Sequence, residues 1–128
     1  MEENITKDFL VQKNIAVAGS FRSKEKVAYR IFLQLKEKGY NVFPVNPSIS
    51  ELEGVKVYGS VLEISQKVDA VDIVTPPAVT EKIVEECKKK GIKYVWMQPG
   101  AESENAIKFC ERNNIKVIYN TCLMVEAG

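Results

Sequence analysis

The sequence predicts an α/β fold with a doubly wound parallel β-sheet, for two reasons. Short apolar runs alternate along the chain with longer amphipathic segments, which is the pattern of strands that alternate with helices. The apolar runs do not alternate polar with apolar residues, so we expect strands that are buried on both faces, as parallel strands are. At 128 residues the chain has a common single-domain size, so we expect residues 1–128 to form one domain.

About six strands are expected. Pro44 indicates that the second strand is short or interrupted there, and the third run is an edge-strand candidate. Right-handed crossovers between parallel strands favour a three-layer Rossmann-like sheet with the strand order 3-2-1-4-5-6. The expected strands are residues 14–19, 41–45, 55–58, 70–75, 93–97 and 116–119.

The helices are predicted from apolar stripes and from their end signals. Val27, Ile31 and Leu35 lie on one such stripe, and Gly39 is the expected stop. Ser60 and Glu63 form a capping-box pattern, which predicts a brief helix. The other expected helices are a short leading one over residues 4–12, one from Pro77 to Gly91 and one over residues 103–113.

Composition and charge exclude several classes of protein. Lys and Arg total 18 and Asp and Glu total 17, so the net charge of +1 argues against nucleic-acid binding. No apolar run approaches the ~20 residues of a membrane-spanning helix. The N-terminus lacks the basic and apolar regions of a secretory signal, so we expect a cytoplasmic protein.

Histidine is absent, so the chain alone cannot build a Ser-His-Asp or Cys-His mechanism, and we predict no catalytic residue. The three cysteines are widely spaced and form no C-x-x-C pair, which argues against a disulfide framework or a zinc site. Cys87 and Cys110 fall on apolar helix stripes and are expected in the core, as is Trp96. Cys122 follows the last strand and is expected to be buried filler; a reactive thiol is the alternative.

A doubly wound sheet binds ligands at the carboxyl ends of its strands, where the winding reverses. In the predicted order this point lies between the strand that ends at Gly19 and the strand that ends at Thr75. Gly19 and Ser20 would let a ligand approach the backbone, and the N–H groups of the next helix suit phosphate. The alternative for Gly19 is a tight turn with no ligand.

Basic residues gather around the start of that helix, at Arg22, Lys24, Lys26 and Arg30. Cations near a helix N-terminus oppose its dipole by ~0.3–1 kcal/mol each at low salt. An anion close by would remove this conflict, whereas a solvated surface is the alternative interpretation.

Three polar-proline corners follow neighbouring strands. They are Asn46–Pro47, Thr75–Pro76–Pro77 and Gln98–Pro99–Gly100. Each alone is a common turn, but together they indicate a rigid wall for a flat ring at one face of the sheet.

The usual dinucleotide fingerprint is incomplete. Only one of the three glycines of G-x-G-x-x-G is present, and the second strand ends in Asn46 rather than in an acidic residue. The P-loop pattern is also absent. An NAD(P)-binding redox enzyme or sensor is therefore the weaker alternative, together with a ligand-free structural or interaction module.

Several motifs resemble the small stand-alone CoA-binding proteins, which are similar to the CoA-binding domain of the succinyl-CoA synthetase alpha subunit. The resemblance runs from about residue 10 to residue 125, and its most specific pieces are Val45-Asn-Pro47 and Trp96-Met-Gln-Pro-Gly100. The other matching pieces are Ile15–Ser20, Gly39–Pro47, Gly54, Val57–Ser60, Val68–Pro77, Val95 and Asn120–Cys122.

The resemblance implies non-catalytic binding of coenzyme A or an acyl-CoA, a small nucleotide ligand. It places Gly19 and Ser20 at the diphosphate, and Arg22 and Lys24 at phosphates that include the 3′-phosphate. Asn46 and Pro47 would border the nucleotide, while Thr75, Pro76 and Pro77 would line the adenine or the pantetheine. Gln98 and Gly100 are further candidates. The phosphohistidine of the large ligases is missing, and the resemblance leaves open whether the protein has a protein partner or forms a homo-oligomer.

Overall fold

The computed structural model describes residues 2–128, with side chains from residue 5 onward. Five parallel strands form one sheet in the order β2-β1-β5-β6-β7. Its strands are β1 (Asn14–Gly19), β2 (Asn41–Val45), β5 (Ala70–Val74), β6 (Tyr94–Met97) and β7 (Lys116–Ile118), and a separate hairpin pairs β3 (Glu51–Leu52) with β4 (Val55–Lys56). The α/β class and the doubly wound parallel sheet are thus confirmed.

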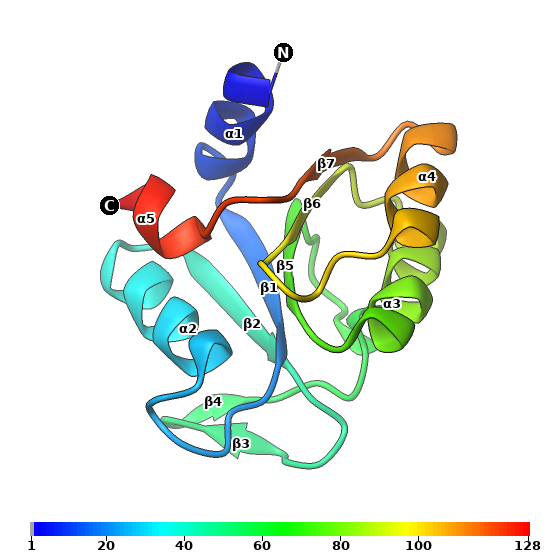
Figure 1. Cartoon of the computed structure of the whole chain (residues 1–128). Coiled ribbons are helices and arrows are strands. Elements are labelled where there is room, and N and C mark those ends of the chain that lie inside the picture. Colours follow the sequence, from blue (N-terminus) through cyan, green and yellow to red (C-terminus); the bar gives the residue numbers. More distant parts are fainter. Residues whose placement is uncertain (1) are drawn as a thin grey trace.

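Helices cover both faces of this sheet (Figure 1). On one face α1 (Glu2–Leu10), α2 (Val27–Glu37) and α5 (Leu123–Ala127) enclose a core that contains Phe32 and Trp96. On the other face α3 (Pro77–Lys90) and α4 (Glu104–Arg112) enclose a second core. The expected helices are present, and the C-terminal helix α5 was not predicted.

The main difference from the prediction is that residues 55–58, expected as the third of six strands, do not join the sheet. Glu53 and Gly54 both have positive φ angles, which turns the chain sharply and pairs Val55–Lys56 with the preceding residues instead. Only Tyr58 keeps a parallel bridge to β2, through Tyr58 N to Pro44 O and Asn46 N to Tyr58 O. Extending that ladder backward would require the N–H of Pro44, which proline lacks.

The brief helix expected from Ser60 is a single 3₁₀ turn, η1 (Val61–Glu63). The Ser60 side chain makes no capping hydrogen bond there. The predicted capping box does not form, because the Glu63 carboxylate accepts its hydrogen bond, of 3.1 Å, from the Gly59 N–H rather than from the Ser60 N–H. The Ser60 hydroxyl is consequently left without a capping role.

Among residues 2–128, no helix combines the length and the apolar character that crossing a membrane requires.

Candidate functional site

A cavity of about 410 Å³ opens at the carboxyl ends of β1, β2 and β5. This is where the winding of the sheet reverses, so the location agrees with the rule for ligand sites in doubly wound sheets. Its volume lies in the usual range for small-molecule sites. The lining residues are Ala18, Gly19, Ser20, Val45, Asn46, Pro47, Ser48, Gly59, Ser60, Val74, Thr75, Pro76, Val79, Lys82, Ile83 and Glu86. We call this cavity the switch-point cleft.

The floor of the switch-point cleft is held by close packing around Gly19. A Cβ atom on Gly19 would lie 2.7 Å from the Ala28 Cβ and 2.9 Å from the Val74 carbonyl oxygen, so only glycine fits without a shift. The Asn46 amide donates a 2.6 Å hydrogen bond to the Gly19 carbonyl, and its Oδ1 accepts one of 2.7 Å from Ser48 N–H. Gly19 and Asn46 therefore lock the ends of β1 and β2 together.

One wall of the cleft is the start of α3. Pro76 is the N-cap residue and Pro77 occupies the first helical position, where its missing N–H costs no hydrogen bond. The Thr75 hydroxyl lies 2.8 Å from the hydroxyl of the buried Thr80, which ties the strand end to the helix. Val79 and Ile83 then supply an apolar surface to the cleft.

Six of the predicted site residues lie together in the cleft lining: Gly19, Ser20, Asn46, Pro47, Thr75 and Pro76. Five do not. Pro77 follows the lining residue Pro76 but does not reach the cavity itself, and Gly100 is exposed in the turn after β6. The other three are Arg22, Lys24 and Gln98.

Arg22 and Lys24 are exposed in the segment 20–26 that separates β1 from α2. Because of this segment, α2 does not begin directly after Gly19 but at Val27. Lys26 is the N-cap residue, with no side-chain capping bond and no acidic residue in the first turn. The positive charges predicted around the helix start are thus exposed to solvent, and none of them lines the cleft.

Gln98 is placed differently from the prediction, because its side chain is buried under the C-terminal segment. Its Nε2 donates to Asp72 Oδ1, and its Oε1 accepts a 3.2 Å hydrogen bond from Leu123 N–H. Burial raises the pKa of Asp72 to about 8, although the hydrogen bond from Gln98 acts in the opposite direction. Gln98 therefore joins β5 to α5 rather than facing the cleft.

The sequence analysis did not identify the polar side chains that α3 brings to the cleft. Lys82 and Glu86 line the cleft together with Val79 and Ile83, and these four residues share one face of α3 at the i, i+3, i+4 and i+7 positions. The spacing was readable, but only its apolar members were assigned to a stripe. Ser60 was missed because its type and spacing indicated a helix cap.

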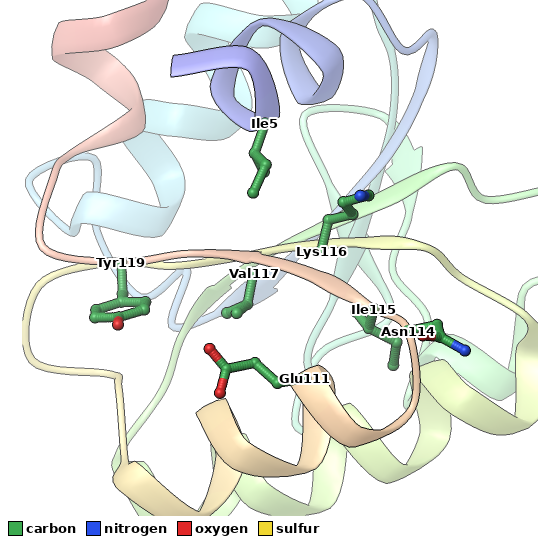
Figure 2. Close-up of a pocket in the computed structure, with 7 residues that line it drawn as sticks. All are labelled: Ile5, Glu111, Asn114, Ile115, Lys116, Val117 and Tyr119. Carbon is green, nitrogen blue, oxygen red and sulfur yellow. The ribbon is translucent and has the colours of Figure 1, made fainter. Parts of the chain in front are cut away.

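A second cavity, of about 380 Å³, lies beside the edge strand β7 and is lined by residues from α1, α4 and β7 (Figure 2). Ile5 of α1 and Glu111 of α4 point toward Val117 from opposite sides. This groove lies at the edge of the sheet, away from the point where the winding reverses, and no polar group of its lining is buried. A short strand that carries a lysine, Lys116, is a common way to prevent unwanted edge pairing. We therefore place the functional site at the switch-point cleft.

In the described part of the chain, neither the cysteines nor the residues that could bind a metal form a second functional site. Cys87 and Cys110 are buried in the α3–α4 core as predicted, and burial raises the pKa of both thiols. Cys122 is half-buried at the N-cap of α5. Within the described part of the chain, no three His, Cys, Asp or Glu residues are grouped to hold a metal ion.

Comparison with known proteins agrees with this geometry. Over 119 residues the chain is 38% identical to the ADP-forming acetate–CoA ligase of Methanocaldococcus jannaschii, covering 87% of this chain and 17% of the ligase. The YneT protein of Bacillus subtilis is 28% identical, with 88% of this chain and 84% of YneT covered. The solved structure of a hypothetical protein from Pyrococcus horikoshii superimposes with a TM-score of 0.92 and 36% identity, over 98% of this chain and 89% of that one.

The chain spans less than a fifth of the length of the acetate–CoA ligases that it resembles, at 17%, 19% and 16% for three of them. A family model described as a CoA binding domain matches residues 13–128. That match includes all five strands of the sheet and every residue of the switch-point cleft. The chain belongs to the CoA binding domain family.

Proposed function

We propose that this protein binds coenzyme A or an acyl-CoA in the switch-point cleft without catalysing a reaction on it. The observation that carries this proposal is a mostly apolar cavity at the reversal of the winding, with hydroxyl groups that have no partner in the protein. Among the described residues, the Ser20 and Ser60 side chains line the cavity and make no hydrogen bond. Apolar pockets with a few convergent polar groups are typical of cofactor sites.

The cleft residues fit the parts of a CoA molecule. Ser20 and the backbone around Gly19 would meet the diphosphate, and Asn46 and Pro47 would border the nucleotide. Thr75, Pro76 and the adjoining Pro77 would pack against the adenine or the pantetheine. This division of the cleft is the one that the resemblance to CoA-binding proteins implies, and the residues concerned follow three neighbouring strands of the sheet, β2, β1 and β5.

Arg22 and Lys24 are exposed and lie outside the cavity lining, so they are available for a part of the ligand that extends beyond the cavity. We assign them to the 3′-phosphate. Both cations lie in the segment before a helix whose first turn has no acidic residue and whose N-cap makes no side-chain bond, and Glu25 offsets only part of their charge, so a bound phosphate would relieve unfavourable local charge.

The absence of catalysis is part of the proposal. The chain has no histidine, and among the described residues only Lys82 and Glu86 bring an ionisable side chain to the cleft lining. Neither contacts a nucleophile that it would activate. We therefore propose that any chemistry on the acyl group belongs to another protein and that this chain holds the carrier.

A thermal-shift and calorimetry panel tests this function directly. The ligands are CoA, acetyl-CoA, dephospho-CoA, NAD, NADPH and ATP, added to protein that has been unfolded, dialysed and refolded to remove retained nucleotide. Ligand at about 100 times its dissociation constant should stabilise the fold by ~2.7 kcal/mol, which is a shift of several degrees. Stabilisation by the CoA compounds alone is expected. A shift with NADPH alone would replace the proposal by a redox function.

The Arg22→Ala variant tests the assignment of the 3′-phosphate. It should weaken CoA about tenfold and leave dephospho-CoA nearly unchanged, because one charged contact to phosphate is lost. Arg112→Ala, at the exposed end of α4, makes the same charge change far from the cleft and is the matched control. Equal weakening of both ligands by Arg22→Ala would remove this role.

A further inference from the structure

Lys82 brings a positive charge into the cleft. Of the lysines and arginines among the described residues, it is the only one that lines the cavity. Arg22 and Lys24, the cations singled out from the sequence, lie outside the cavity. The positive charge within the cleft therefore comes from α3, across from the loop that follows β1.

Lys82 is also not neutralised by the protein. Within the described part of the chain, no carboxylate lies within 4 Å of its Nζ. Glu86 is one helical turn further on and lines the same cavity, but a lysine four residues before a glutamate is the weaker orientation for a helical ion pair. An exposed cation beside an apolar cavity is thus free to meet an anionic ligand group.

We propose that Lys82 binds the diphosphate of the ligand from the α3 wall, facing the backbone at Gly19 and Ser20 on the floor. This inference rests on the proposed function and divides the charges of the site. Lys82, inside the cavity, meets the diphosphate, whereas Arg22 and Lys24, outside it, meet the 3′-phosphate. All CoA compounds share the diphosphate, so Lys82 contributes to affinity for the whole class and not to discrimination of the 3′-phosphate.

The proposal also predicts that Glu86 weakens the binding of the ligand that Lys82 strengthens. Its carboxylate lines the same cavity and repels an anionic ligand that Lys82 attracts. Its charge lies near that of Lys89 and near those of Glu63 and Glu85. Replacing Glu86 by glutamine removes this repulsion and keeps the shape of the side chain, so it should strengthen the binding of phosphate-bearing ligands.

The test is calorimetric titration of wild-type, Lys82→Gln and Glu86→Gln proteins with CoA, dephospho-CoA and ADP. Lys82→Gln should weaken all three ligands by the same factor, about tenfold, the size of one charged contact to phosphate. Glu86→Gln should strengthen all three about threefold. Lys93→Gln, an exposed lysine before β6 at the opposite end of the sheet, makes the same charge change and should alter none of them.

The outcomes separate this inference from the proposed function. Wild-type binding of CoA with an unchanged affinity in Lys82→Gln would overturn the role of Lys82 and leave the proposed function standing. A loss confined to CoA, with dephospho-CoA and ADP unaffected, would overturn the diphosphate assignment in favour of the 3′-phosphate. Failure of the wild-type protein to bind CoA would overturn the proposed function itself. Lys82 is exposed, so the variant should keep the wild-type melting temperature, which confirms that it is folded.

Discussion

The carboxyl ends of β1, β2 and β5 leave an open cleft, whereas the carboxyl end of β6 is covered by the C-terminal segment. Trp96 Nε1 donates a 2.9 Å hydrogen bond to the Thr121 carbonyl, and Leu123 N–H donates to the Gln98 side chain. Gln34 of α2 donates to the Met124 carbonyl and holds α5 from the other side. The position of a residue after a parallel strand is thus not sufficient for a ligand site; the strand end must also remain uncovered.

We expect substitutions in these two regions to have different effects. Changes at the covered end should lower the stability of the fold and leave the affinity of the folded protein intact. Changes at the open cleft should alter ligand affinity with little effect on stability. The variants below test this separation, beginning with the largest expected loss of stability.

Gln98→Ala should lower the free energy of unfolding by about 3 kcal/mol. The substitution removes the donor to the buried Asp72 and the acceptor of Leu123 N–H, so two buried polar groups lose their partners at once. Urea unfolding measures the effect, and Asn105→Ala on the exposed face of α4 is the amide control. A weakened CoA affinity with unchanged stability would place Gln98 in the ligand site after all.

Asp72→Asn should change how stability depends on pH. In the folded protein the pKa of Asp72 is about 8, above its ordinary value, so the folded state keeps a proton that the unfolded chain releases. The wild type therefore loses stability as pH rises from about 4 to about 8, by up to ~1.4 kcal/mol per pH unit, and the loss levels off above that range.

The asparagine variant lacks this loss. Its stability relative to the wild type should rise between about pH 5 and about pH 8 in urea unfolding. A difference between the two proteins that stays constant across this range would contradict the buried, protonated state of Asp72. Asp8→Asn on the exposed surface of α1 is a suitable control for the change of charge.

Gly19→Ala and Gly59→Ala form a matched pair within the cleft lining. At Gly19 the new methyl group would meet the backbone of Val74 and the short side chain of Ala28, so we expect a loss of about 2 kcal/mol. At Gly59 it would meet only the flexible Glu63 carboxylate, and the loss should be smaller. Thermal unfolding of both variants measures the difference. Equal stabilities would contradict the packing constraint at Gly19.

Ser60→Ala should have the smallest effect on stability, within about 0.5 kcal/mol, because its hydroxyl makes no hydrogen bond in the protein. It should weaken CoA about threefold if that hydroxyl contacts the ligand. Ser50→Ala, in the same connection but outside the cleft, is the control. A loss of stability without a loss of affinity would return Ser60 to the role of a helix cap.

Much of the fold was predictable because it depends on local patterns. The runs at residues 14–19 and 41–45 became β1 and β2 with the expected bounds. The continuously apolar run of β1 is buried as a central parallel strand should be, whereas β2 is the edge strand and is buried only at its last two residues. Gly39 and Gly91 end their helices with positive φ angles, which glycine adopts at no steric cost. The location of the cleft followed from strand order alone.

The remaining features depend on contacts between residues distant in sequence. Pro44 removes the donor that a sixth strand would need, and this became visible only once Tyr58 was seen to lie beside it. Gln98 follows a strand just as Thr75 does, but α5 covers only Gln98. Lys82 and Glu86 face the cleft because α3 packs beside η1 and the end of β5.

The sequence by itself determined the elements, the winding of the sheet and the glycine and proline corners, because these depend on backbone chemistry and apolar periodicity. The tertiary structure decided which strand ends stay open and which charges face them, because burial depends on segments that meet only after folding.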